Sequence, residues 1–317
     1  LVTDVNGRAR TMVLPYGQYT LVETKTSTGY ALGEDVSFSI SVPPEDGDDY
    51  SYVDLNLVNL KMAQIEIYKL MGDGSSTPMN GVVFGLFDAA TKTEIARLVT
   101  DEDGYASIYM KPGEYYIEEI STWSGYAMTS EQFQVSAEWA AIYHFHVSNS
   151  ETTTRVEKTS TTGAYLAGCG FSIKDEATGK LVEMYYDTAR GEYVALVSDK
   201  ITAPTGAPIV TTAYTGKDGV MSVRGLIANQ KYTVFEVEAP AGYVNDSKPV
   251  SVTVVAKSGV LGTARFVDSS IVIKTGEIDD TRNEILATAA LITAASLIAV
   301  LYLVQRNRRR KQEVYRG

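Results

Sequence analysis

The sequence predicts an all-β protein, built from tandem antiparallel β-sandwich domains and ending in one C-terminal transmembrane helix. Apolar and polar residues alternate with a period of two over many short segments, as in half-buried strands. Turn-forming residues separate these segments at intervals of roughly ten residues, which is typical of β-sandwiches. A third observation, an uncharged apolar stretch near the C-terminus, predicts the helix.

One sequence pattern occurs three times and divides the chain. In each copy a glutamate ends an alternating segment and precedes a Gly-Tyr pair: Glu23 before Gly29, Glu119 before Gly125 and Glu236 before Gly242. We therefore expect a partial domain over residues 1–60 (the first unit), a complete domain over 61–150 (the second unit) and a domain with an insertion over 151–270 (the third unit). Repeats of this length suit separate domains rather than a solenoid. Because the chain starts at Leu1 without a signal peptide, we expect a fragment or processed form.

Each complete unit places an amine, an acid and an amide or second acid in the phase of its apolar side chains. Alternate side chains of a strand share a face, so these polar groups should point into the core with their apolar neighbours. They are Lys69, Glu119 and Asn149 in the second unit, and Lys158, Glu236 and Asp268 in the third. In the first unit Glu23 and Asn59 keep the pattern, and we expect their lysine to lie before Leu1.

Three interpretations of these residues are open: ordinary surface polarity, a buried salt bridge, or a self-formed amide cross-link. Burial favours the neutral form of a lysine, and a neutral amine is a nucleophile. Such an amine can attack the side-chain carbonyl carbon of Asn or Asp and expel ammonia or water. A buried glutamate with a raised pKa can hold the proton that polarises this carbonyl. We favour the cross-link, with bonds Lys69–Asn149 and Lys158–Asp268 and no cofactor.

These motifs also carry a family resemblance that covers residues 1–270. The segment from Gly17 to Glu23, followed by Gly29-Tyr30, resembles the E-box of Cna B-type domains, also called SpaA-like or prealbumin-like domains. The Gly81-x-x-Phe84 and Gly168-x-x-Phe171 segments resemble the same domains. The resemblance implies Ig-like or prealbumin-like sandwiches of Gram-positive pilins and adhesins. It also implies isopeptide bonds, promoted here by Glu119, Glu236 and Glu23.

The C-terminal region predicts attachment to the cell envelope. Residues 285–304 carry no charge and could span roughly 30 Å, which is one bilayer core. The basic residues of the tail, 305–317, favour a cytoplasmic C-terminus and an external N-terminus, although a buried soluble helix is the alternative.

A pentapeptide in the linker, residues 271–284, resembles a cell-wall sorting signal. It reads Val-Ile-Lys-Thr-Gly over residues 272–276, with Val-Ile where the sorting family has Leu-Pro. The resemblance implies that a sortase-type transpeptidase cuts between Thr275 and Gly276 and joins the chain to peptidoglycan. In the alternative, the helix stays in the membrane as the anchor.

Composition and the remaining motifs exclude several other function classes. The net charge is −11, and because the tail at 305–317 carries +5 the rest of the chain carries −16, which argues against a nucleic-acid partner. The single cysteine, Cys169, cannot form an intrachain disulfide, and we expect it to be buried. His144 and His146 share an outward face without an evident third metal ligand, and the acidic residues of 46–49 suit a solvated loop. We find no hydrolase or nucleotide-binding motif and expect no enzyme activity beyond single-turnover cross-linking.

The leading hypothesis is therefore a secreted structural protein of the cell surface, either a pilin subunit or the stalk of an adhesin. Its expected partners are the sortase, peptidoglycan, the membrane, and other pilin subunits or host matrix proteins. One alternative is an adhesin whose β domains bind a host or matrix ligand themselves. Another is a stalk that carries an enzyme on a part preceding Leu1.

Overall fold

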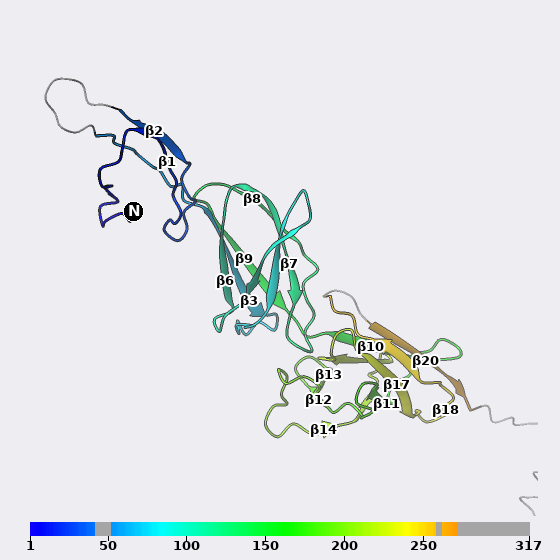
Figure 1. The fold of residues 1–317 in the computed structure, drawn as a ribbon. Coiled ribbons are helices and arrows are strands. Elements are labelled where there is room, and N and C mark those ends of the chain that lie inside the picture. Colours follow the sequence, from blue (N-terminus) through cyan, green and yellow to red (C-terminus); the bar gives the residue numbers. More distant parts are fainter. Residues whose placement is uncertain (42–51, 258–261, 272–317) are drawn as a thin grey trace, which may run out of the picture. The chain divides into compact units, whose positions relative to one another are not determined.

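The computed structural model describes residues 1–41, 52–257 and 262–271, which form strands, turns and irregular segments (Figure 1). None of these described residues belongs to a helix long and apolar enough to span a membrane. The expected helix at 285–304, the basic tail at 305–317 and the pentapeptide at 272–276 lie outside the described residues. The acidic residues of 46–49 also lie outside them.

In its described residues the first unit contains one antiparallel pair, β1 (Gly17–Leu21) and β2 (Val36–Ile40). Tyr19 stacks on Phe38 across this pair, with ring centroids 5.6 Å apart. Residues 55–59 alternate apolar and polar side chains as a strand does, but they form no strand in the structure. Their side chains still alternate, with Leu55, Leu57 and Asn59 half-buried, so the predicted phase is confirmed.

The second unit is a sandwich of two sheets with strand orders β6-β3-β9 and β5-β4-β7-β8 (Figure 1). The strands are β3 (Ala63–Met71), β4 (Val83–Asp88), β5 (Glu94–Val99), β6 (Tyr105–Met110), β7 (Gly113–Ser121), β8 (Phe133–Ala137) and β9 (Ile142–Asn149). Ile65 and Ile67 of one sheet and Phe84, Leu86 and Ile117 of the other are buried in one cluster. The core therefore lies between the sheets, as the alternating pattern predicts.

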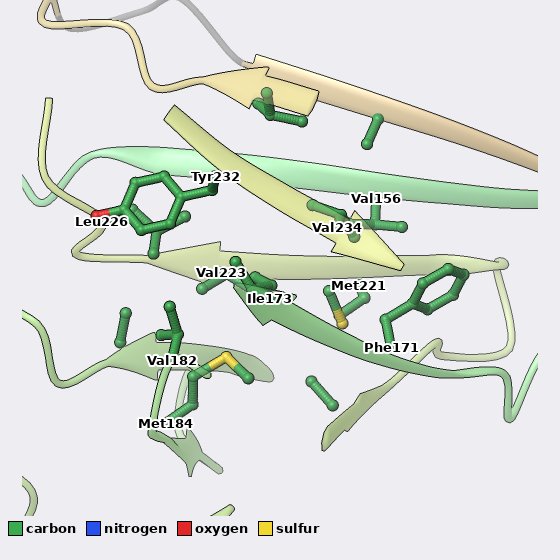
Figure 2. Close-up of a cluster of buried hydrophobic side chains, with 14 of the residues drawn as sticks. Val156, Phe171, Ile173, Val182, Met184, Met221, Val223, Leu226, Tyr232 and Val234 are labelled. Atoms are coloured by element: carbon green, nitrogen blue, oxygen red, sulfur yellow. The ribbon is translucent and has the colours of Figure 1, made fainter. Parts of the chain in front are cut away.

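The third unit is a larger sandwich, with strand orders β14-β12-β13-β16-β10-β20-β18 and β15-β11-β17-β19. Its strands are β10 (Thr153–Ser160), β11 (Gly170–Asp175), β12 (Met184–Asp187), β13 (Glu192–Ala195), β14 (Ile209–Val210), β15 (Thr212–Tyr214), β16 (Val220–Arg224), β17 (Lys231–Glu238), β18 (Tyr243–Val244), β19 (Val250–Thr253) and β20 (Gly262–Ser270). Figure 2 shows Phe171, Met221 and Val234 among the buried side chains that these strands enclose. The predicted insertion supplies β12 to β15: β12, β13 and β14 extend one sheet, whereas β15 pairs with β11 in the other sheet, as β5 pairs with β4 in the second unit.

Most strand pairs are antiparallel, as predicted, but the first and last strands of each complete unit run parallel. In β3 and β9, Lys69 lies opposite Val147, so Asn149 lies two residues further along. In β10 and β20, Lys158 lies opposite Phe266, so Asp268 is again two residues further along. Residues two apart share a face, so both registers bring the amide or acid onto the face of the lysine. The two units thus share one arrangement.

Candidate functional site

The second unit brings Lys69, Glu119 and Asn149 together in its interior. They come from β3, β7 and β9, and they are 0%, 7% and 1% exposed. Lys69 Nζ lies 3.8 Å from Glu119 Oε1, and Asn149 Nδ2 donates to the same oxygen at 2.5 Å. Asn149 Nδ2 also donates to Thr122 Oγ1 at 2.8 Å, and Glu119 Oε2 accepts from the Thr129 N–H at 2.7 Å. The carboxyl group therefore lies beside both the amine and the amide.

Burial shifts both ionisable groups of this site towards their neutral forms. Desolvation lowers the pKa of Lys69 to about 8, although the charge of Glu119 opposes the shift. Desolvation raises the pKa of Glu119, against the opposing effects of Lys69 and the hydrogen bonds to its carboxylate. Among the described residues, neither Lys69 Nζ nor Asn149 Oδ1 has a hydrogen-bond partner. No hydrogen bond from the described residues thus holds the Lys69 amine or the Asn149 carbonyl oxygen.

The third unit brings Lys158, Glu236 and Asp268 together in the same way. Lys158 Nζ donates to Glu236 Oε2 at 2.7 Å, to Asp268 Oδ1, and to Ser247 Oγ at 2.8 Å. Lys158 and Asp268 are not exposed at all, and Glu236 is 8% exposed. Desolvation raises the pKa of Glu236, although its hydrogen bond to Lys158 opposes this. Within the described residues, Glu236 Oε1 and Asp268 Oδ2 have no hydrogen-bond partner.

A glycine turn fixes the backbone of each lysine. The N–H of Lys69 donates to the carbonyl of Gly104 at 2.7 Å, and that of Lys158 donates to Gly219 at 2.8 Å. Both glycines have a φ of +69°, which favours glycine, and a Cβ at either would collide with the lysine carbonyl oxygen. The turns at residues 100–104 and 215–219 therefore help to position the two lysines.

The first unit holds the acid and the amide of the pattern. Asn59 Nδ2 donates to Glu23 Oε2 at 2.5 Å and to the Ala31 carbonyl at 2.8 Å, and the Gly33 N–H donates to Glu23 Oε2 at 2.7 Å. Glu23 and Asn59 are both half-buried. No lysine in the part of the chain that the structure describes forms an ion pair or hydrogen bond with either residue. The contact nevertheless repeats the one between Asn149 and Glu119.

The remaining candidate residues are two histidines, one cysteine and the Thr-Gly pair of the pentapeptide. His144 and His146 are exposed on the outer face of β9; His144 Nδ1 lies 2.9 Å from Glu66, and His146 stacks on Tyr68. The described ranges contain no group of three or more His, Cys, Asp or Glu residues arranged to hold a metal ion. Cys169 is free and buried, which confirms its prediction. Thr275 and Gly276 lie outside the described residues.

Sequence reasoning missed two hydroxyl groups at these sites, those of Thr122 and Ser247. Thr122 stands three residues after Glu119, and Thr26 stands three residues after Glu23, so a repeat comparison could have found Thr122. Ser247 gives no such signal, because it lies between β18 and β19 in a stretch without alternation. Its contacts with Lys158 and Asp268 follow from the path of that segment.

The fold and the buried polar groups together define a class of protein. Its members are built from tandem β-sandwich domains whose cores hold an amine, an acid and an amide or second acid. A match to a domain family identifies this class more narrowly. The family described as the SpaA prealbumin-like fold domain matches residues 1–55, 63–150 and 152–269, and the chain belongs to this family. The fold that the alternating pattern and the E-box resemblance predict is thereby confirmed as all-β and prealbumin-like.

One individual relative shares a limited sequence identity with part of the chain. The chain is 29% identical over 120 residues to the trypsin-resistant surface T6 protein of Streptococcus pyogenes, a match that covers 35% of this chain and 22% of that protein. The chain thus spans less than a quarter of that relative's length.

Solved structures are similar as well. The Bacillus anthracis TIE protein is 19% identical over 84% of this chain and 44% of its own, with a TM-score of 0.36. The shaft pilin SpaA of Lactobacillus rhamnosus GG is 15% identical over 67% of this chain and 99% of its own, with a TM-score of 0.30. The minor pilin GBS52 of Streptococcus agalactiae is 14% identical over 68% and 99%, with a TM-score of 0.31.

Proposed function

We propose that this chain is a structural protein of the bacterial cell surface, a pilin subunit or adhesin stalk, stabilised by self-formed amide bonds. The bonds join Lys69 to Asn149 and Lys158 to Asp268. One observation carries the proposal: both complete units bury a lysine, a glutamate and an asparagine or aspartate, on equivalent strands and in the same parallel register. A single buried ion pair would be unremarkable, whereas its repetition with an amide replacing an acid points to shared chemistry.

In the second unit the reaction expels ammonia. The neutral Lys69 amine attacks Cγ of Asn149, so that the Nζ–Cγ bond forms while electrons move to Oδ1. Glu119, in contact with Asn149 Nδ2, protonates this nitrogen as the Cγ–Nδ2 bond breaks. Glu119 then recovers a proton from Nζ, so it ends the reaction as it began. Fixed geometry replaces a bimolecular encounter, which favours the reaction without any external enzyme.

In the third unit the reaction expels water. A proton moves from the Lys158 ammonium to the Asp268 carboxylate, which leaves a neutral amine beside a carboxylic acid. The Nζ–Cγ bond forms, and one carboxyl oxygen leaves as water with both protons that Nζ loses. Burial raises the pKa of Glu236, so this group can hold a proton and polarise the carbonyl.

Such bonds would stabilise a chain that cannot use disulfides. The sequence contains one cysteine, so the usual covalent support of small extracellular β domains is not available within it. The two amide bonds would close loops of about 80 and 110 residues, and by the loop entropy known for disulfides each would contribute roughly 4–5 kcal/mol. Each bond would also tie a first strand to the adjacent last strand, so tension would not separate them.

Surface attachment is the second part of the proposal. The relatives are named as a surface protein, a shaft pilin and a minor pilin, and membership of one domain family supports the same class for this chain. The uncharged residues 285–304 and the basic tail suit a membrane segment with an external N-terminus. The Thr275-Gly276 step suits a sortase-type transpeptidase that joins the chain to peptidoglycan.

Intact mass spectrometry of the purified chain tests the cross-links. We expect losses of about 17 Da and about 18 Da, one for each covalent step, located by peptide mapping at the two lysines. The variant E119Q should lose only the first bond and E236Q only the second. The matched control is E118Q, because Glu118 is the preceding residue of β7 and contacts Gln132 instead of the site. An unshifted wild-type mass would leave buried salt bridges as the correct interpretation.

A further inference from the structure

We propose that Ser247 is a further catalytic residue of the Lys158–Asp268 reaction, which relays protons from the amine to the carboxyl oxygen that leaves. The inference rests on the proposed cross-linking function and names a fourth group at that site. Ser247 Oγ accepts from Lys158 Nζ at 2.8 Å and lies 2.8 Å from Asp268 Oδ1. Its hydroxyl group therefore bridges the two atoms between which protons must move.

The position of Ser247 selects one of the two carboxyl oxygens. Asp268 Oδ1 contacts both the amine and the serine hydroxyl, whereas Oδ2 has no hydrogen-bond partner among the described residues. Within the described part of the chain the serine proton has one other acceptor, the Val267 carbonyl at 3.1 Å, which is a longer contact. We therefore assign Oδ1 as the leaving oxygen and Oδ2 as the oxygen of the new amide.

The chemistry of this unit explains why it needs such a relay. Nζ must lose two protons and Oδ1 must gain two, because the products are a secondary amide and water. In each transfer Ser247 accepts a proton from Nζ and gives its own proton to Oδ1, so the hydroxyl group is regenerated. Glu236 contacts Nζ through Oε2, while its Oε1 contacts no described residue by hydrogen bonding. Glu236 can thus polarise the acceptor while Ser247 serves the leaving group.

The second unit supports this division of labour. There the leaving atom is Asn149 Nδ2, and Thr122 accepts a hydrogen bond from that atom. Thr122 stands three residues after Glu119, but the same position after Glu236 holds Ala239, which has no hydroxyl. In the third unit the hydroxyl comes instead from Ser247, on a different segment. Each complete unit thus places one hydroxyl on its leaving atom, and the two hydroxyl groups come from different segments.

The test follows both bonds in the same full-length chain. After a short pulse of cell-free synthesis, cross-linked peptides from each unit are quantified over time for wild type, S247A and S247T. We expect S247A to slow the Lys158–Asp268 bond about 100-fold, in the range of general acid–base catalysis, and S247T to restore it. The Lys69–Asn149 bond should form at the wild-type rate in all three and serves as an internal control of folding.

The outcomes separate this inference from the proposed function. If wild type forms the Lys158–Asp268 bond and S247A forms it equally fast, Ser247 has no catalytic role although the cross-link stands. Equal slowing of both bonds in S247A, or no rescue by S247T, would also overturn the inference, because either result indicates a structural defect. If wild type forms no such bond, both the inference and the proposed chemistry of the third unit are wrong.

Discussion

In the proposed reaction of the second unit, the location of one proton decides whether Lys69 can attack. A productive site needs a neutral lysine and a protonated Glu119, which together hold a single proton. The resting ion pair holds the same number of protons, so exchange within the pair can generate the productive form. Below the raised pKa of Glu119 the pair holds two protons and the amine is blocked. Above the lowered pKa of Lys69 the pair holds none, and the acid is lost.

The rate of Lys69–Asn149 bond formation should therefore depend on pH as a bell. We expect it to rise as pH passes the raised pKa of Glu119 and to fall as pH passes the Lys69 pKa of about 8. Peptide mapping of freshly synthesised chain, incubated at a series of pH values, measures this rate. A rate that rises to a plateau above pH 8, without a fall, would show that Glu119 does not act as an acid.

The inward phase of the candidate site residues could be predicted from the sequence, while their full set of contacts could not. Lys69 and Glu119 follow apolar residues at a spacing of two, and a strand puts such residues on one face whatever its neighbours are. Ser247 lies outside any alternating segment, so only the folded path of its loop brings it to Asp268. The period of two therefore identifies site residues on strands, but it misses site residues on loops.

At the scale of elements, the turn glycines control the position of the lysine strands. Gly104 contacts the Lys69 backbone, whereas Gly81 has the same kind of left-handed conformation, φ +70°, with open space around the position of a Cβ. Substitutions at these two glycines therefore distinguish the cost of backbone strain from the cost of a steric collision. Alanine at either costs about 1–3 kcal/mol for the unfavourable φ, but only Gly104 also faces the lysine carbonyl oxygen.

We expect G104A to slow the Lys69–Asn149 bond and to lower the unfolding temperature more than G81A does. The added Cβ must displace the carbonyl of Lys69, and with it the strand that carries the amine. Cross-linked peptide yield and thermal unfolding measure the two effects, and the bond in the third unit provides the internal reference. Equal effects of the two substitutions would show that the turn does not position the amine.

Strand direction and the role of the insertion could not be predicted from the sequence. A period of two identifies faces but carries no information on neighbours, so the parallel pairing of β3 with β9 has no signal of its own. The strands β12 to β15 contain between two and four residues each, too few for a clear pattern. Their attachment also uses a buried Arg224 that contacts Asp187 at 3.0 Å, a contact between distant segments.

At the scale of the whole molecule, the proposed bonds and the proposed anchor serve the same purpose. A surface stalk must carry load from its outer end to the cell envelope, and each amide bond would join the first and last strands of a unit. Tension would then enter and leave a unit through two neighbouring strands that are joined by a covalent bond. That arrangement is useful only if the C-terminal end is itself fixed, which makes the attachment step at Thr275-Gly276 a separate requirement.

Changing Thr275 and Gly276 together to alanine should move the protein from the cell-wall fraction to the membrane fraction. The transpeptidase would lose the bond it cuts, while the uncharged segment 285–304 would still hold the chain in the bilayer. Muramidase digestion of expressing cells, followed by fractionation and immunoblotting, measures the distribution.

The matched control for this variant changes Thr205 and Gly206 to alanine in the third unit. A Cβ added at Gly206 would meet no atom within 4 Å, so the substitution carries the backbone strain of a positive φ but no collision. Because this Thr-Gly pair lies far along the chain from the pentapeptide, we expect the control to stay in the cell-wall fraction. Wild-type protein found only in membranes would contradict sorting and favour direct anchoring by the helix.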